Sequence, residues 1–129
     1  MIVLKYNYFF VSSSDGKTNC VIRSFCKLFN EKYDNVYEEL NNISKELKCN
    51  SFNDVLVFET YMKRHNTTLI KYGKDIRIKD LKLDNGEYII FCWDKKNFYH
   101  MVSIIDNNLY DNDDKCLELY TIKIYKKNV

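Results

Sequence analysis

Apolar positions in the first half of the chain recur with the period of a helix. From Cys20 to about Asn30 the apolar side chains fall at helical spacing, on Val21, Ile22, Phe25, Leu28 and Phe29. Asn19 stands directly before this stretch, where a short polar side chain can accept hydrogen bonds from the first amides of a helix. The pattern therefore predicts a helix that begins at Cys20.

Two more helices are predicted downstream. One runs from about Asn35 to Lys48, with Asp34 as its N-terminal cap, and the other runs from about Asn53 to Arg64. All of the predicted helix therefore lies in the first half of the chain.

The second half changes to the pattern of β-strands. Runs rich in β-branched and aromatic residues alternate with short polar turns, at Gly86 to Trp93, Tyr99 to Ile105, Asn108 to Asp111 and Leu117 to Tyr125. Helices followed by strands predict an α+β fold in which N-terminal helices pack on a C-terminal antiparallel sheet. The N-terminal run, residues 1–11, is expected to be a strand or an extended arm that packs its aromatic side chains on the core.

Length and charge limit the class of protein. The chain has 129 residues, no Pro and three Gly, so we expect one domain over residues 1–129. The 20 basic and 18 acidic residues are spread along the chain, which does not indicate a nucleic-acid partner. No signal-peptide pattern and no run of roughly 20 apolar residues is present. We therefore expect a cytoplasmic protein without a membrane partner.

The five cysteines differ in their expected chemistry. Their number is odd and no C-x-x-C pair occurs, so we expect reduced thiols and neither a metal nor another cofactor. Cys20 alone opens a predicted helix, where unpaired amides and the helix dipole favour a thiolate. The open alternatives for Cys20 are a nucleophile and a small core residue.

A nucleophilic thiol needs a base and a group that orients the base. His65 falls at the end of the third predicted helix, where we interpret it as a surface cap. His100 instead follows a polar loop and opens a predicted strand. The structural alternative for His100 is a polar residue at the end of a strand.

Strand parity places carboxylates near His100. The hairpin turn is centred on residues 106–107 or on residues 107–108, and in both registers His100, Asp111 and Asp113 project from one face. In the first register Asp111 lies diagonal to His100, with about 7 Å or less between Cβ atoms. A His-carboxylate pair is therefore predicted, although residues 111–114 are also consistent with a simple acidic turn.

The same residues resemble those of a known family. The stretch "NCVIRSFCKLFNEKYDNVYEEL" is similar to the opening of small papain-like proteins of bacteriophages and bacteria, in which a D/N-C-x-x-R-A/S helix precedes a Y-D-x-V-Y-E-E-L helix. "NGEYIIFCW" and "YHMVSIIDNNLYDNDD" resemble the closing pattern of these proteins, a G-x-Y-I strand followed by H-x-V-x-V-I-D-G and Y-D. The resemblance spans about Thr18 to Asp114.

The resemblance implies a role for each of three residues. Cys20 becomes the nucleophile, His100 the base and Asp111 the orienting carboxylate. The wider papain-like group, which includes bacteriocin-processing, double-glycine-type peptidases, shares this chain order on a fold of helices and an antiparallel sheet. Two departures stand out: Asn107 replaces a common turn glycine, and Asp113 replaces an aromatic residue and competes for the third role.

The donor that would stabilise an oxyanion is not evident from the sequence. Ser14 lies six residues before Cys20, where papain-like enzymes commonly carry Gln. Asn19 and the Cys20 backbone amide are the alternatives. Arg23 matches the family motif without an assigned role, and we interpret it as an exposed helix charge.

Together these features predict a thiol hydrolase, a cysteine peptidase or an isopeptidase or amidase, that forms an acyl-thioester on a peptide or protein substrate. Deamidation and acyl transfer would use the same residues. The alternative is a catalytically inactive binding or inhibitory module of phage or bacterial origin, acting in the host cytoplasm if a phage encodes it.

Overall fold

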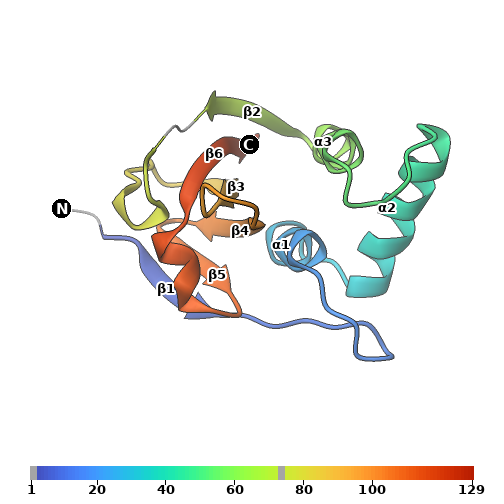
Figure 1. Cartoon of the computed structure of the whole chain (residues 1–129), viewed down its shortest axis with the longest axis horizontal. Coiled ribbons are helices and arrows are strands. Elements are labelled where there is room, and N and C mark those ends of the chain that lie inside the picture. Colours follow the sequence, from blue (N-terminus) through green and yellow to red (C-terminus); the bar gives the residue numbers. More distant parts are fainter. Residues whose placement is uncertain (1–2, 73–74) are drawn as a thin grey trace.

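The computed structural model describes residues 3–72 and 75–129, which form three α-helices and a six-stranded sheet (Figure 1). The helices lie on one face of the sheet, with α1 next to β4 and α2 farthest from it. The strand order is β1-β5-β4-β3-β6-β2. The elements are β1 (Lys5–Tyr8), α1 (Cys20–Phe29), α2 (Tyr33–Glu46), α3 (Val55–Arg64), β2 (Thr67–Tyr72), β3 (Glu87–Trp93), β4 (Tyr99–Ile105), β5 (Asn108–Asp111) and β6 (Tyr120–Lys127).

The first helix begins at the predicted residue because its cap forms. The Asn19 side-chain oxygen accepts hydrogen bonds from the amides of Val21 and Ile22, at 2.9 and 3.1 Å. These bonds satisfy amides that have no acceptor within the helix. Cys20 is therefore fixed as the first residue of α1.

The caps of the other two helices differ from one another. Asp54 caps α3 as a side-chain acceptor for the Leu56 amide, at 2.9 Å. The prediction that Asp34 caps α2 is wrong, because α2 begins at Tyr33 and its cap position is Lys32. The Tyr33 side chain is buried in the core, which draws this residue into the first turn. Asp34 lies within that turn, where its charge still complements the helix dipole.

The β4–β5 hairpin adopts the first of the two predicted registers. Ile105 lies opposite Asn108, and Ser103 lies opposite Tyr110. The two central turn residues, Asp106 and Asn107, both have positive φ, at 48° and 66°. This is the backbone of a type I′ turn, which Asn accepts without a glycine.

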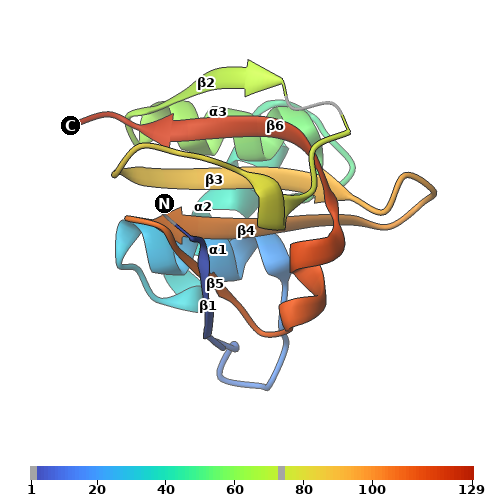
Figure 2. The ribbon, with the colours of Figure 1, turned by 90° about the vertical axis from the view of Figure 1, so that its left-hand side faces the viewer.

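The sheet is mixed, so the prediction of a wholly antiparallel C-terminal sheet is wrong at one edge, where β1 comes from the N-terminus and pairs in parallel with β5. At the other edge β2, a strand that the sequence analysis did not predict, pairs antiparallel with β6. β1 and β5 run steeply across the direction of β4 (Figure 2). Sequence periodicity is a local signal and does not reveal such long-range pairings.

The two ends of the chain also differ from the prediction. Of the N-terminal run, residues 1–2 lie outside the described residues and Lys5–Tyr8 forms a strand; Tyr6 packs on the core, but Tyr8 and Phe10 are exposed. The predicted last strand begins later, at Tyr120. The residues before it, Asp114–Glu118, form a short 3-10 helix that Asp113 caps.

Two apolar clusters hold the sheet from opposite faces. One fills the space between the sheet and the helices, and it contains Phe25, Leu40, Phe58, Ile89 and Met101. The other covers the far face, with Ile90, Val102, Ile104, Leu109 and Ile124. The alternation of Ile89 and Ile90 between the clusters follows from the period of two in a strand. In the part of the chain that the structure describes, no helix has the length and apolar character needed to cross a membrane.

The helix–sheet cluster predicts that alanine substitutions of two leucines differ greatly in their effect on stability. Leu40 is fully buried, whereas Leu56 is 54% exposed. Leu40→Ala is expected to lower the free energy of unfolding by about 2–5 kcal/mol because it leaves a cavity. Leu56→Ala, the matched control, is expected to change it by only about 0.5 kcal/mol. Urea unfolding monitored by circular dichroism measures both, and equal losses would contradict this account of the core.

Candidate active site

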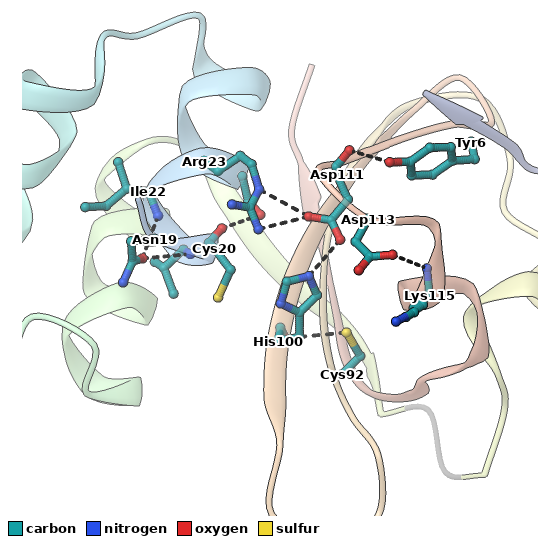
Figure 3. Close-up of polar contacts among 12 residues, drawn as sticks. Tyr6, Asn19, Cys20, Ile22, Arg23, Cys92, His100, Asp111, Asp113 and Lys115 are labelled. Carbon is teal, nitrogen blue, oxygen red and sulfur yellow. Dashed lines mark hydrogen bonds and ion pairs between the residues drawn. The ribbon is translucent and has the colours of Figure 1, made fainter. Parts of the chain in front are cut away.

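The fold brings Cys20, His100 and Asp111 together from three elements (Figure 3). Cys20 is the first residue of α1, His100 the second residue of β4, and Asp111 the last residue of β5. Eighty residues separate the thiol from the imidazole in the sequence. Packing of α1 against β4 closes this distance.

The imidazole of His100 is held by a carboxylate. Its Nε2 atom lies 2.8 Å from Oδ2 of Asp111, and the Asp111 side chain is 1% exposed. A protonated Nε2 donates this bond, which leaves Nδ1 as the ring nitrogen available to another group. Cys20 and His100 line the same two cavities (Figure 3), and the interaction between thiol and ring lowers the pKa of Cys20 and raises that of His100.

The second oxygen of Asp111 is bound by Arg23. The Arg23 side chain donates from Nε and from a terminal nitrogen to Oδ1, at 3.1 and 3.0 Å. Arg23 is only 4% exposed, so the interpretation of Arg23 as an exposed helix charge is wrong.

The burial of Arg23 has a visible signal in the sequence. Apolar residues surround it at Val21, Ile22, Phe25 and Cys26, so little of the helix surface near Arg23 remains for solvent. The structure agrees, because nearly every residue of α1 from Val21 to Leu28 is buried. Periodicity alone does not show which residue across the fold binds the guanidinium.

The environment lowers the pKa of the Cys20 thiol. Burial by itself would raise this pKa, but the hydrogen bond with His100 and the imidazole's positive charge outweigh burial. The backbone amide of Met101 and the charge of Arg23 act in the same direction. All of these groups stabilise the thiolate.

The pKa values of His100 and Asp111 move in the directions that complement a thiolate. Burial would lower the pKa of His100, but hydrogen bonds with Asp111 and Cys20 raise it to about 9. Burial would raise the pKa of Asp111, but His100 and Arg23 lower it. Relative to the free side chains, the three shifts therefore favour a thiolate, an imidazolium and a carboxylate.

The thiols that are buried elsewhere in the chain have raised pKa values. Burial raises the pKa of Cys26 to about 11 and that of Cys92 well above its ordinary value. Burial and the nearby charge of Asp111 raise the pKa of Cys116. Cys20, by contrast, is partly exposed and has a lowered pKa.

The two candidate oxyanion residues lie in different places. Asn19 lines the cavities beside Cys20, and its Nδ2 donates to the side-chain oxygen of Asn53 at 3.1 Å. Ser14 lies in an exposed turn and lines neither of these cavities. The structure thus places Asn19, and not Ser14, next to the thiol.

The other predicted residues make separate contacts. Asp113 accepts a hydrogen bond from the Lys115 amide at 3.0 Å and so caps the short 3-10 helix, whereas Asp111 contacts the imidazole. His65 caps α3, as interpreted from the sequence, and lies 2.7 Å from a Glu39 carboxylate oxygen. We therefore interpret His65 and Asp113 as residues that cap helices.

Two cavities meet at the Cys20–His100 pair. The first, of about 490 Å³, has mainly apolar walls formed by Val55, Phe58, Phe91, Tyr99 and Met101. The second, of about 520 Å³, is the more polar of the two, with walls that include Thr18, Asn112, Asp113 and Lys115. A molecule bound across the thiol would therefore meet an apolar site on one side and a more polar site on the other.

Within residues 3–72 and 75–129, no group of three His, Cys, Asp or Glu side chains is arranged to hold a metal ion. Comparisons with protein-family models, with curated proteins and with solved structures found no match to this chain. Its function must therefore be inferred from the chemistry of the site.

The lowered pKa predicts that Cys20 is alkylated selectively in mild acid. At pH 6, iodoacetamide is expected to modify Cys20 at least about tenfold faster than Cys49, the other partly exposed thiol, because only thiolates react. Peptide mass spectrometry over a time course measures both rates. His100→Ala, the control, should remove most of the difference, and equal rates in the unaltered protein would refute the electrostatic account.

Proposed function

We propose that this protein is a thiol hydrolase with a papain-like arrangement, which cleaves an amide bond through an acyl-thioester on Cys20. The observation that carries the proposal is the chain of contacts from Asp111 through His100 to a half-buried thiol at a helix N-terminus. Nucleophilic catalysis by cysteine needs these three elements in this order. A cysteine helix packed on strands that carry His and then Asp supports the papain-like assignment.

The reaction begins from the ion pair. The Cys20 thiolate attacks the carbonyl carbon, a carbon–sulfur bond forms and the carbonyl electrons move to oxygen. The imidazolium of His100 then protonates the leaving nitrogen, so that the carbon–nitrogen bond breaks and an acyl-thioester remains. Water, deprotonated by His100, attacks the thioester, and Cys20 departs as a thiolate. Asp111 keeps the ring oriented throughout.

Two donors next to the sulfur can stabilise the oxyanion. The backbone amide of Cys20 is the first in α1 and has no acceptor within the helix. The Asn19 side-chain nitrogen carries two hydrogens and gives one to Asn53, which leaves the other for an oxyanion. We therefore assign this role to Asn19 and the Cys20 amide rather than to Ser14.

The substrate is a peptide or protein with a large apolar group near the amide that is cleaved. The apolar cavity beside Cys20 supports this assignment, because a polar group that entered it would lose hydrogen bonds to water and gain few from the walls. Peptide and isopeptide bonds fit the chemistry equally. All five cysteines are free thiols, which supports action in the reducing cytoplasm.

A binding or inhibitory module is the second candidate function. The observation in its favour concerns Ser14, which stands where papain-like enzymes commonly carry the side-chain donor to the oxyanion. Ser14 is exposed and lines neither cavity beside Cys20, so it cannot supply this donor. Such a module would bind peptides across Cys20 without cleaving them.

Hydrolysis and its covalent intermediate separate the two candidates. With a library of fluorogenic peptides that carry bulky apolar groups, we expect turnover and an acyl adduct on Cys20 detectable by intact-mass spectrometry. Asp111→Asn is expected to lower turnover by roughly 10²–10⁴-fold, because an amide no longer fixes the tautomer of the ring or stabilises the imidazolium as the carboxylate does. Cys20→Ala is the control. Peptide binding without any adduct would favour the module, and equal turnover in Cys20→Ala would exclude Cys20 as the nucleophile.

The apolar cavity predicts a second, more specific effect. Val55 lines the cavity, whereas its neighbour Leu56 is not among the lining residues and is more exposed. Val55→Lys is expected to lower kcat/KM for apolar peptides by about tenfold or more, because a charge must then be desolvated or displaced when the substrate binds. Leu56→Lys, the matched control, should leave kcat/KM unchanged, and equal effects of both variants would contradict the assignment of this cavity.

A further inference from the structure

We propose that Arg23 is a fourth functional member of the site, a positioning residue whose guanidinium balances the charge of Asp111 so that a thiolate and an imidazolium can coexist without a net buried charge. The inference rests on the proposed function for its biological meaning. It concerns the ionisation of the site, and that ionisation can be measured without any substrate.

The contacts divide the Asp111 carboxylate between two cations. Oδ2 faces His100 Nε2 at 2.8 Å, and Oδ1 receives both bonds from Arg23, at 3.0 and 3.1 Å. Arg23 lies three residues after Cys20, about one turn along α1. One helix therefore carries both the nucleophile and the cation that neutralises the orienting carboxylate.

Because this ion pair is buried, the loss of either of its charges is expected to have a large effect on the site. Among the residues whose burial the structure describes, Arg23 and Asp111 are the charged side chains that are fully buried. Interactions between charges in such a place are screened much less than at the surface. A buried charge without a partner is strongly unfavourable.

With Arg23 present, the site has no net charge in either proton state. The un-ionised form consists of a thiol, a neutral imidazole, the carboxylate and the guanidinium, which sum to zero. Transfer of the proton from Cys20 to His100 adds one negative and one positive charge, so the sum stays zero. Without Arg23 both forms carry a net charge of −1, and the thiolate also loses the nearby positive charge of the guanidinium. Loss of Arg23 is therefore expected to raise the pKa of the Cys20 thiol.

The other groups that face the site do not supply this positive charge. Tyr6 of β1 donates its hydroxyl to the Asp111 backbone carbonyl at 2.9 Å. The thiols of Cys92 on β3 and Cys116 have raised pKa values and are neutral at neutral pH. Asp113 and Lys115 line the polar cavity but are exposed and oppositely charged. From the helix side Asn53 contributes only an amide.

Two substitutions separate the charge of Arg23 from its shape. Arg23→Gln keeps a hydrogen-bond donor but removes the charge, whereas Arg23→Lys keeps the charge but loses the two-pronged contact. In Arg23→Gln, the inflection for alkylation of Cys20 by iodoacetamide is expected to move up by at least about one pH unit, so that the rate at pH 6 falls about tenfold. In Arg23→Lys the inflection should move by less than half as much. Thiolate absorbance at 240 nm provides an independent titration.

A second pair of variants covers the case in which Arg23→Gln alone fails to fold. Asp111→Asn removes the partner of Arg23, and the double variant Arg23→Gln with Asp111→Asn removes both charges. The double variant is expected to have a higher inflection than Asp111→Asn, by a similar pH difference.

Three results would overturn the inference: an unchanged inflection in Arg23→Gln, equal shifts in Arg23→Gln and Arg23→Lys, and coincident inflections of the double variant and Asp111→Asn. Failure of the proposed function looks different. In that case the predicted shifts in alkylation appear, but no peptide is cleaved.

Discussion

The carboxylate of Asp111 is the point on which the site depends, because it joins the helical half of the protein to the sheet. One oxygen binds the imidazole on β4 and the other binds the guanidinium on α1. The same contacts that orient His100 therefore also fix the helix that begins with Cys20. Fold and chemistry are coupled here, since a shift of α1 against β4 would separate the thiol from the imidazole and the guanidinium from its carboxylate.

Burial in this site acts in two opposite directions. It would raise the pKa of a thiol and lower that of an imidazole, which would suppress the ion pair. It also strengthens every interaction between the charges that remain. The net result, a lowered pKa for Cys20 and a raised pKa for His100, arises because each buried charge has a partner. The groups that lower the pKa of Cys20 are the side chains of His100 and Arg23 and the backbone amide of Met101.

Local sequence signals predicted much of this arrangement. The Asn19 cap predicted the first residue of α1, and both hairpin registers considered from the sequence placed His100 and Asp111 on one face, of which the structure adopts the first. The features that the sequence did not predict depend on distant partners. The parallel pairing of β1 with β5 and the burial of Arg23 both follow from contacts across more than eighty residues. No periodicity encodes which distant segment supplies such a partner.

The central claim is that Cys20 and His100 form a charge-balanced ion pair, and NMR titration of the His100 ring tests it most directly. In the unaltered protein the ring is predicted to stay protonated to about pH 9. In Cys20→Ala the pKa of His100 is predicted to fall by at least about one unit, because the imidazolium then has no thiolate to balance it. The same pKa in both proteins, or a ring that is neutral at pH 7 in the unaltered protein, would contradict the account.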